Sequence, residues 1–528
     1  MERHGSQSFF VIGEGLLGES AGGRDAPQVA IAALAARAAP PFRFSRMGPN
    51  GRGHQLGESL RKRLGNAMAH TGGGASQIPS GFTYLGQFVD HDLTMDKTTV
   101  MLDAAVSPTA LLQARSPSLD LDSLYGAGPQ DPESAKFYEA DGVHLKTGRT
   151  VAIGGDRAMS GFDLPRGLGR SAAARRKAVI PDPRNDENLA VAQTHCAFIR
   201  FHNRVVDTLP RAVPPSQRFA TAREIVTRHY QWMLRTDLLP RLCARAVVED
   251  VFRNGRKAFE VGVAPTDVPT MPIEFSIAAY RLGHSMIRQA YNWNARFDNG
   301  GGTLDFLFLF SGTSGDLAGG PRLPSNWIAD FRRLYDFGEA GRRDLVVPAR
   351  KLNRAMRIDT LLVDPLKNLP PGSFGGPNVP FNDARANLAF RNLTRARMVN
   401  LSTGQQMVRF LNRHGVRVRA LTAAQLRDGR GGASLRRLTD AQRRALLRDT
   451  PLWFYVLREA ELNGGRTSGV GARIVAETFH RAMEGSAVSI VRDPRWRPTL
   501  GPNRDTFRMV DLLLFAFEGR RALLAPLG

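Results

Sequence analysis

Residues 188–209, NLAVAQTHCAFIRFHNRVVDTL, carry the strongest helical pattern of this chain. Apolar side chains recur three, four or seven positions apart, at Leu189, Ala192, Cys196, Ile199 and Val206. That spacing places them on one face of an α-helix. The segment therefore predicts a long helix that packs against a core, and with it a mainly α fold.

Helical periodicity recurs elsewhere, at residues 60–68, 84–93, 218–238, 273–290, 387–399 and 434–447. Strand signals are sparse, and residues 305–310 are the best candidate. Residues 98–180 are rich in turn-forming residues and predict long loops. We expect one large, mainly α domain over residues 57–520, with long loops and little β-structure. An N-terminal arm (1–56), with one short helix at 28–37, precedes it, and a C-terminal tail (521–528) follows.

Composition excludes several classes of protein. The 528 residues are 42% hydrophobic, which suits a globular chain with a sizeable core. No run approaches the roughly 18 apolar residues of a membrane span, so no transmembrane segment is expected. The two cysteines rule out a disulfide framework and a multi-cysteine zinc site. The N-terminus shows no signal-peptide pattern, which predicts a cytoplasmic protein by default, or one exported by a route without such a signal.

The chain is strongly basic, with 72 Lys and Arg against 49 Asp and Glu, a net charge of +23. Such a field attracts nucleic acids, anionic lipids and small anions alike. The basic residues do not alternate with aromatic ones, and no recognised nucleic-acid-binding motif is present. We therefore expect a solvated basic surface and no dedicated nucleic-acid partner. The sequence assigns no oligomeric state.

Two segments contain a histidine next to an acidic residue or a glycine. In residues 86–92 (GQFVDHD), Gln87 and His91 would share one helix face, with Asp90 beside them. In residues 280–285 (YRLGHS), Gly283 precedes His284 and leaves room for a flat group to approach. Taken singly, each segment is better explained structurally, 86–92 by a helix-end histidine between solvated acids and 280–285 by a core histidine.

Three further segments are polar. Residues 184–187 (RNDE) precede the long helix. Acidic side chains at this position are also explained by their favourable interaction with the N-terminal end of the helix dipole. Residues 392–397 (NLTRAR) lie on a predicted helix and suit an exposed face. Residues 116–122 (SPSLDLD) carry oxygen-bearing side chains at every second position, which an extended loop would turn to one side. Calcium takes six to eight such oxygens, although a turn-rich loop is the simpler interpretation.

The order and separation of these motifs are specific where each motif alone is weak. From about residue 80 to 461 the chain resembles the animal-type haem peroxidases of the peroxidase–cyclooxygenase superfamily, in a bacterial-looking version. The resemblance rests on segments 86–92, 120–126, 184–187, 201–204, 280–284 and 392–397. It implies a large single-domain helical haem peroxidase fold that binds haem b. It also implies reduction of hydrogen peroxide and oxidation of small organic donors or halides through a ferryl intermediate.

The resemblance assigns roles to the residues at matching positions. His284 matches the proximal haem ligand, and Asn392 the acceptor for the other ring nitrogen. His91 matches the distal histidine, which acts as general base and then acid. Arg184 matches the distal arginine, a cation for charge that develops as the O–O bond breaks. Gln87 matches the residue that positions the distal water or halide.

Further matches concern how haem and calcium are held. Asp90 and Glu187 occupy positions that form ester bonds to haem in many relatives. We therefore expect that haem can become covalently attached to this protein. Residue 188 is asparagine where a methionine would form an added sulfonium link, which favours bromide, iodide, thiocyanate or phenols over chloride. Arg395 matches a partner of a haem propionate. The calcium-site positions of the family fall on Asp92, Ser116, Ser118, Asp120 and Asp122.

Two alternatives stay open. The superfamily includes fatty-acid dioxygenases, whose radical-forming tyrosine lies three residues before the proximal histidine. Arg281 occupies that position here and Tyr280 lies one residue further away, which favours a peroxidase. The second alternative is a basic protein with a decayed haem site that binds nucleic acid or membrane through its charge.

Overall fold

A computed structural model describes residues 10–11, 42–51, 56–69, 74–100, 103–153, 160–167, 169–369, 379–380 and 382–528. Most of the expected N-terminal arm, including the helix expected at 28–37, lies outside these residues.

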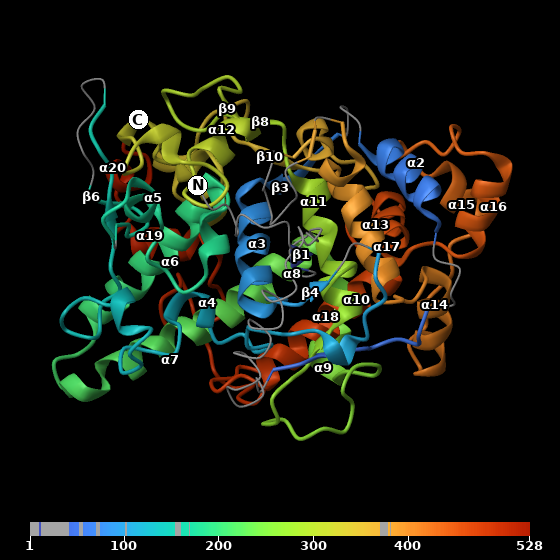
Figure 1. Ribbon diagram of the computed structural model, residues 1–528. Coiled ribbons are helices and arrows are strands. Elements are labelled where there is room, and N and C mark those ends of the chain that lie inside the picture. Colours follow the sequence, from blue (N-terminus) through green and yellow to red (C-terminus); the bar gives the residue numbers. More distant parts are fainter. Residues whose placement is uncertain are drawn as a thin grey trace.

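Helices dominate the regular structure (Figure 1). The α-helices are α2 (Glu58–Met68), α3 (Gly81–Leu93), α4 (Asp122–Tyr125), α5 (Ala172–Arg176), α6 (Leu189–Thr208), α7 (Pro215–Met233), α8 (Leu239–Leu242), α9 (Arg245–Asn254), α10 (Ile273–Ser276), α11 (Gly283–Met286), α12 (Leu304–Leu309), α13 (Leu388–Met398), α14 (Gly404–Arg413), α15 (Ala423–Asp428), α16 (Asp440–Arg448), α17 (Leu452–Leu462), α18 (Gly469–Glu484), α19 (Met509–Ala516) and α20 (Arg521–Leu524). The predicted mainly α class is confirmed.

Strands are short, and within the described ranges every sheet has two of them. They are β1 (Phe10–Val11) with β4 (Thr99–Val100), β2 (Phe44–Ser45) with β7 (Met271–Pro272), β3 (Ala75–Pro79) with β10 (Arg354–Met356), β5 (Gly148–Arg149) with β6 (Ser160–Asp163), and β8 (Ala290–Tyr291) with β9 (Gly302–Thr303). The β2–β7 pair is parallel and the others are antiparallel. No helix of the described residues is long and apolar enough to cross a bilayer.

The predicted long helix is α6. Asn188 starts it, because its side-chain oxygen accepts a hydrogen bond from the Val191 amide at 2.9 Å. The five apolar residues that predicted the helix are all buried. They face the interior, where α6 packs against α3, α7 and α19.

Two local predictions are wrong. Residues 305–310, expected as a strand, form most of helix α12, and the Thr303 hydroxyl caps it. A short apolar run without alternation cannot be assigned to strand or helix by its period alone. Residues 273–290, expected as one helix, form α10, the 3-10 helix η5 (Ala279–Leu282) and α11 instead. Ala278, at φ −131° and ψ −72°, interrupts the helical backbone.

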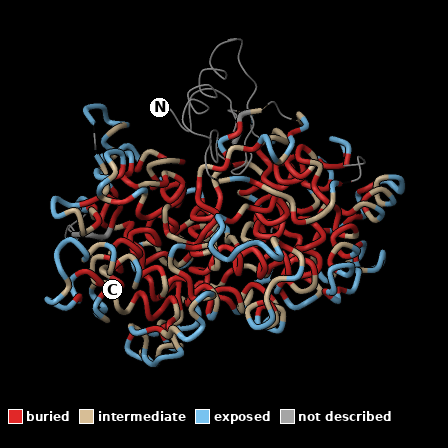
Figure 2. The backbone as a smooth tube through the Cα atoms, turned by 90° about the horizontal axis from the view of Figure 1, so that it is seen from below, coloured by how far each residue is buried: buried red, intermediate tan, exposed pale blue. Residues whose placement is uncertain are grey.

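Helix α3 runs through the centre of the molecule, between α6 on one side and α11 on the other (Figure 1). Strand β3 leads into it almost directly. Phe88 anchors α3 to its neighbours, because its ring stacks on Phe198 at 4.5 Å and meets Tyr230 edge-on at 6.4 Å. Buried residues fill the interior along the whole length of the molecule (Figure 2).

Candidate functional site

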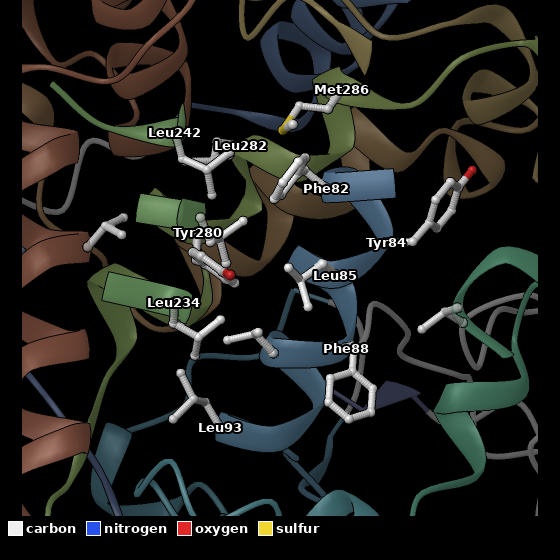
Figure 3. Close-up of a cluster of buried hydrophobic side chains, with 14 of the residues drawn as sticks. Phe82, Tyr84, Leu85, Phe88, Leu93, Leu234, Leu242, Tyr280, Leu282 and Met286 are labelled. Atoms are coloured by element: carbon white, nitrogen blue, oxygen red, sulfur yellow. The ribbon is translucent and has the colours of Figure 1, made fainter. Parts of the chain in front are cut away.

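One cavity, with about 900 Å³ of space including its mouth, opens beside α3. Its walls come from α3, the segment around η5 and α11, the start of α6, and α12. The lining residues are Phe82, Thr83, Tyr84, Gly86, Gln87, Asp90, His91, Glu187, Asn188, Leu242, Tyr280, Arg281, Leu282, Gly283, His284, Met286, Ile287, Leu304, Phe308 and Leu388. Side chains of α3 and of the 280–286 segment face each other across this region (Figure 3). Five predicted site residues thus line one space, although almost 200 positions separate Gln87 from His284.

His284 lies on helix α11 and lines the cavity together with its neighbours in residues 280–287. Burial, followed by the charges of Arg281 and Arg395, holds the pKa of its imidazole well below the ordinary value. The ring is therefore neutral at neutral pH, which is the form that binds metals. An added Cβ on the preceding Gly283 would meet open space. This agrees with the expectation that Gly283 leaves room beside the histidine.

Asn392, on α13, contacts the far side of the His284 ring. Its amide nitrogen lies 2.9 Å from His284 Nδ1, and its amide oxygen has no partner among the described residues. With the nitrogen facing the ring, the imidazole proton would be on Nε2. Turning the amide over lets its oxygen accept from Nδ1–H and leaves Nε2 for a ligand. Either way, the side-chain pair predicted from the sequence is in contact.

His91 is fixed from behind by a residue to which the sequence assigned no role. Its Nδ1 lies 2.9 Å from the amide oxygen of Asn185, which is fully buried. With the amide oxygen facing the ring, Nδ1 would donate to it and carry the proton. Asn185 stands inside the quoted motif at 184–187, so its position was visible in the sequence, but its partner was not.

Arg184 does not line the cavity. Its guanidinium donates to Asp182 and, through Nη2, to the backbone carbonyl of His91 at 2.9 Å. Although burial opposes it, the guanidiniums of Arg115 and Arg184 hold the pKa of Asp182 well below its usual range. This buried cluster fixes Arg184 against the end of α3, so the structure connects Arg184 to the cavity through His91.

Asp90, Glu187 and Gln87 share the wall nearest His91. Asp90 and Glu187 come from different elements, α3 and the turn before α6, yet both line the cavity. The Gln87 side-chain oxygen accepts a hydrogen bond of 2.9 Å from Asn188. Arg395 is buried on α13, one turn beyond Asn392, and does not line the cavity. Its charge reaches the site as a contribution to the lowered pKa of His284.

The five predicted calcium ligands are brought only partly together. Asp92 accepts from the Ser123 hydroxyl at 3.0 Å, while Asp120 accepts from Ser486 and from the Ala487 amide on a different side. Ser116 donates its backbone amide to Asp122 at 3.1 Å, and Ser118 donates its hydroxyl to Gly485. The segment is not the expected extended run, because Leu121 has φ +58° and α4 starts at Asp122. The described residues hold no group of three or more His, Cys, Asp and Glu side chains that could bind a metal ion.

A buried carboxylate, Asp92, nevertheless lies close to the partly buried carboxylate of Asp122 here. Burial first, and then the neighbouring Asp122, hold the pKa of Asp92 well above its ordinary value. Burial also raises the pKa of Asp122, and its Oδ1 atom has no partner among the described residues.

Comparison with known proteins agrees with this geometry. Residues 97–306 match the family model described as animal haem peroxidase. A peroxidase-like protein of Margaritifera margaritifera is 30% identical over 252 residues, which cover 40% of this chain and 32% of that protein. Rat (Rattus norvegicus) thyroid peroxidase is 26% identical over 196 residues, 35% of this chain and 20% of that protein. The similarity to these curated relatives therefore spans a third of their length or less.

Solved structures share the fold over most of the chain. Peroxidase A from Dictyostelium discoideum matches with a TM-score of 0.61 at 14% identity, over 92% of this chain and 94% of its own. A fatty acid alpha-dioxygenase from Arabidopsis thaliana matches with a TM-score of 0.56 at 13% identity, over 90% and 77%. The chain thus has the helical fold of the haem peroxidases, which the dioxygenases share.

Proposed function

We propose that this protein is a haem peroxidase, which reduces hydrogen peroxide to water and oxidises small organic donors or halides such as bromide, iodide and thiocyanate. The observation that carries the proposal is that His91 and His284, from separate elements, line one cavity. Each has one ring nitrogen engaged by a buried asparagine. The match of residues 97–306 to the haem peroxidase family supports it.

The residues present fit haem. His284 Nε2 would bind the iron, Gly283 and Gly86 leave space for the flat ring, and Arg395 would offset propionate charge. Near Gly86, an added Cβ would meet only the Tyr280 hydroxyl, at 3.8 Å. When bound, haem supplies the iron that binds peroxide and accepts the two oxidising equivalents released by O–O cleavage.

The protein's own part is proton transfer and positioning. His91 would take a proton from one oxygen of the peroxide and return it to the departing oxygen, which leaves as water. Asn185 keeps the His91 proton on Nδ1, and Arg184 holds the carbonyl of the same residue. Gln87, fixed by Asn188, positions water or a halide. The direct test is an absorption spectrum of the haem-loaded protein with and without peroxide, together with dye oxidation. A protein without a Soret band overturns the proposal.

A second candidate is fatty-acid oxygenation. Tyr280 lines the cavity, and its buried hydroxyl has no hydrogen-bond partner among the described residues. A fatty acid alpha-dioxygenase is among the proteins with this fold. Oxygen uptake on addition of palmitate to the haem-loaded protein would establish this activity, and its absence would leave the peroxidase proposal alone.

Covalent attachment is expected from the two carboxyl groups on the cavity wall. Asp90 and Glu187 would each form an ester to a haem methyl group during the first turnovers with peroxide. We expect haem in the turned-over protein to resist extraction with acidified solvent, and the Asp90→Asn, Glu187→Gln double variant to release it. Asp305→Asn, an exposed carboxylate beside the cavity wall, is the matched control. Easy extraction from the unmodified protein would remove the esters and leave peroxidase activity unaffected.

Calcium is proposed between Asp92 and Asp122, with Ser116, Ser118 and Asp120 as the further ligands. A cation would allow both carboxylates to ionise, and the raised pKa values of Asp92 and Asp122 are consistent with a cost of ionisation without one. At a hundredfold excess over its Kd, calcium should stabilise the fold by about 2.7 kcal/mol. Thermal unfolding with calcium and with EGTA measures this, and magnesium is the control ion because it prefers a smaller, octahedral shell. An equal unfolding temperature in calcium and in EGTA would contradict the site.

A further inference from the structure

A second pocket lies directly behind one wall of the cavity. It has about 840 Å³ of space including its open mouth, and its lining residues are Arg288, Gln289, Ala290, Thr303, Asp305, Met356, Val363 and Pro365. The same two chain segments separate the two spaces. Met286 and Ile287 line the cavity while the next two residues line the pocket, and Leu304 faces the cavity between two residues that face the pocket. The same two segments therefore contribute to the walls of both spaces.

Two hydrogen-bonded tyrosines cross this region. Tyr84, which lines the cavity, donates its hydroxyl to Tyr291 Oη at 2.7 Å, and the ring centres are 6.0 Å apart. Tyr291 directly follows Ala290 of the pocket, and its oxygen also accepts the backbone amide of Arg288 at 2.9 Å. Both rings are almost completely buried, at 2% and 1% exposure. In the close-up, Tyr84 leaves α3 on the side away from Tyr280 (Figure 3).

The surface pocket has the chemistry to hold an aromatic donor. Met356, Val363 and Pro365 offer an apolar wall for a ring. The Arg288 guanidinium is held at the rim by the carbonyls of Ala290 and Arg354, at 3.0 and 2.8 Å. A fixed guanidinium is a good partner for a carboxylate on such a ring.

We propose that Tyr84 and Tyr291 form an electron relay, through which phenolic donors bound in the surface pocket reduce the peroxide-oxidised haem. This proposal rests on the proposed peroxidase function and extends it to donors too large for the cavity.

In each cycle of the relay, one donor molecule gives up one electron. The tyrosine pair would give one electron to the oxidised haem and release one phenolic proton. A phenol in the pocket would then return one electron and one proton to the pair. The products are a phenoxyl radical and an unchanged tyrosine pair. Two such cycles would supply the two electrons and the two protons that reduce one hydrogen peroxide to two waters.

The test combines a spectroscopic and a kinetic measurement on the haem-loaded protein. Tyr84→Phe and Tyr291→Phe keep the rings and remove the hydroxyls. Tyr138→Phe, which removes another buried, hydrogen-bonded hydroxyl outside the cavity, is the matched control. Electron paramagnetic resonance is recorded on samples frozen after peroxide addition without donor. Turnover is measured with iodide, which enters the cavity, and with a phenol coupled to dextran, which cannot.

We expect a tyrosyl radical signal in the unmodified protein and in the Tyr138 variant, and its loss in the Tyr84→Phe, Tyr291→Phe double variant. Oxidation of the dextran-bound phenol should fall about tenfold or more in Tyr291→Phe, while iodide oxidation stays nearly constant. An unchanged radical in the double variant, or equal losses with both donors, would overturn the relay and leave the peroxidase intact. If the unmodified protein oxidises neither donor, both proposals fall together.

Discussion

Replacement of His284 by alanine is expected to abolish the Soret band of the haem-loaded protein and to reduce peroxide-dependent oxidation to the level of free haem. The reason is that His284 is a neutral imidazole on the cavity wall, with its pKa lowered by desolvation and by the charges of Arg281 and Arg395. No proton has to leave the ring before it binds a metal. Asn392→Leu should have a smaller effect, with haem binding about 10–100-fold weaker, because it removes only the ring's hydrogen-bond partner.

The control for this experiment is His414→Ala, which removes an exposed histidine of the same chain far from the cavity lining. Its spectrum should match that of the unmodified protein. Circular dichroism melting separates loss of haem from loss of fold. A His284→Ala protein that keeps the same Soret band would show that another residue binds the iron.

Replacement of His91 by glutamine should leave the spectrum without peroxide almost unchanged and slow the reaction with peroxide by about 10²–10⁴-fold. In the proposed mechanism haem is held by His284, whereas His91 is the proton acceptor for peroxide. Stopped-flow absorbance at increasing peroxide concentration measures the rate directly.

Asn185→Leu tests how His91 is held. This variant keeps the imidazole but removes the oxygen that fixes its Nδ1 proton, so the peroxide reaction should slow by less than in His91→Gln. The rate should also change its dependence on pH, because the ring proton is no longer held on one nitrogen. A His91→Gln protein that reacts with peroxide at the unmodified rate would exclude His91 as the base.

Much of the fold follows from local patterns. The spacing of apolar residues in 188–209 predicted α6, and the same reasoning predicted α3 and α13. This reasoning failed where one local pattern is compatible with two kinds of secondary structure. Residues 305–310 are apolar without a clear period, and only packing beside the cavity makes them a helix. Residues 434–447 are helical only from Asp440, since a capping box at Thr439 sets the start.

Part of the candidate site could likewise be predicted from the sequence, and part could not. The resemblance to a known family, carried by several motifs in a fixed order, singled out His91, His284, Gln87, Asp90 and Glu187, and all five line one cavity. The contact between His284 and Asn392, predicted from the resemblance, is present. The sequence assigned no role to Asn185 or Asp182, because a hydrogen-bond partner 94 positions away from His91 leaves no local pattern. It also assigned Arg184 to the cavity, whereas the structure turns its guanidinium to Asp182 and the His91 carbonyl.

The sequence by itself determined the helical class and supplied the candidate site residues, because periodicity and side-chain chemistry are local properties of the chain. The tertiary structure alone decided which of them share a cavity, that an asparagine contacts each histidine ring, and that Tyr84 meets Tyr291. Those properties depend on distances between segments separated by up to about two hundred residues, which are fixed only when the core packs.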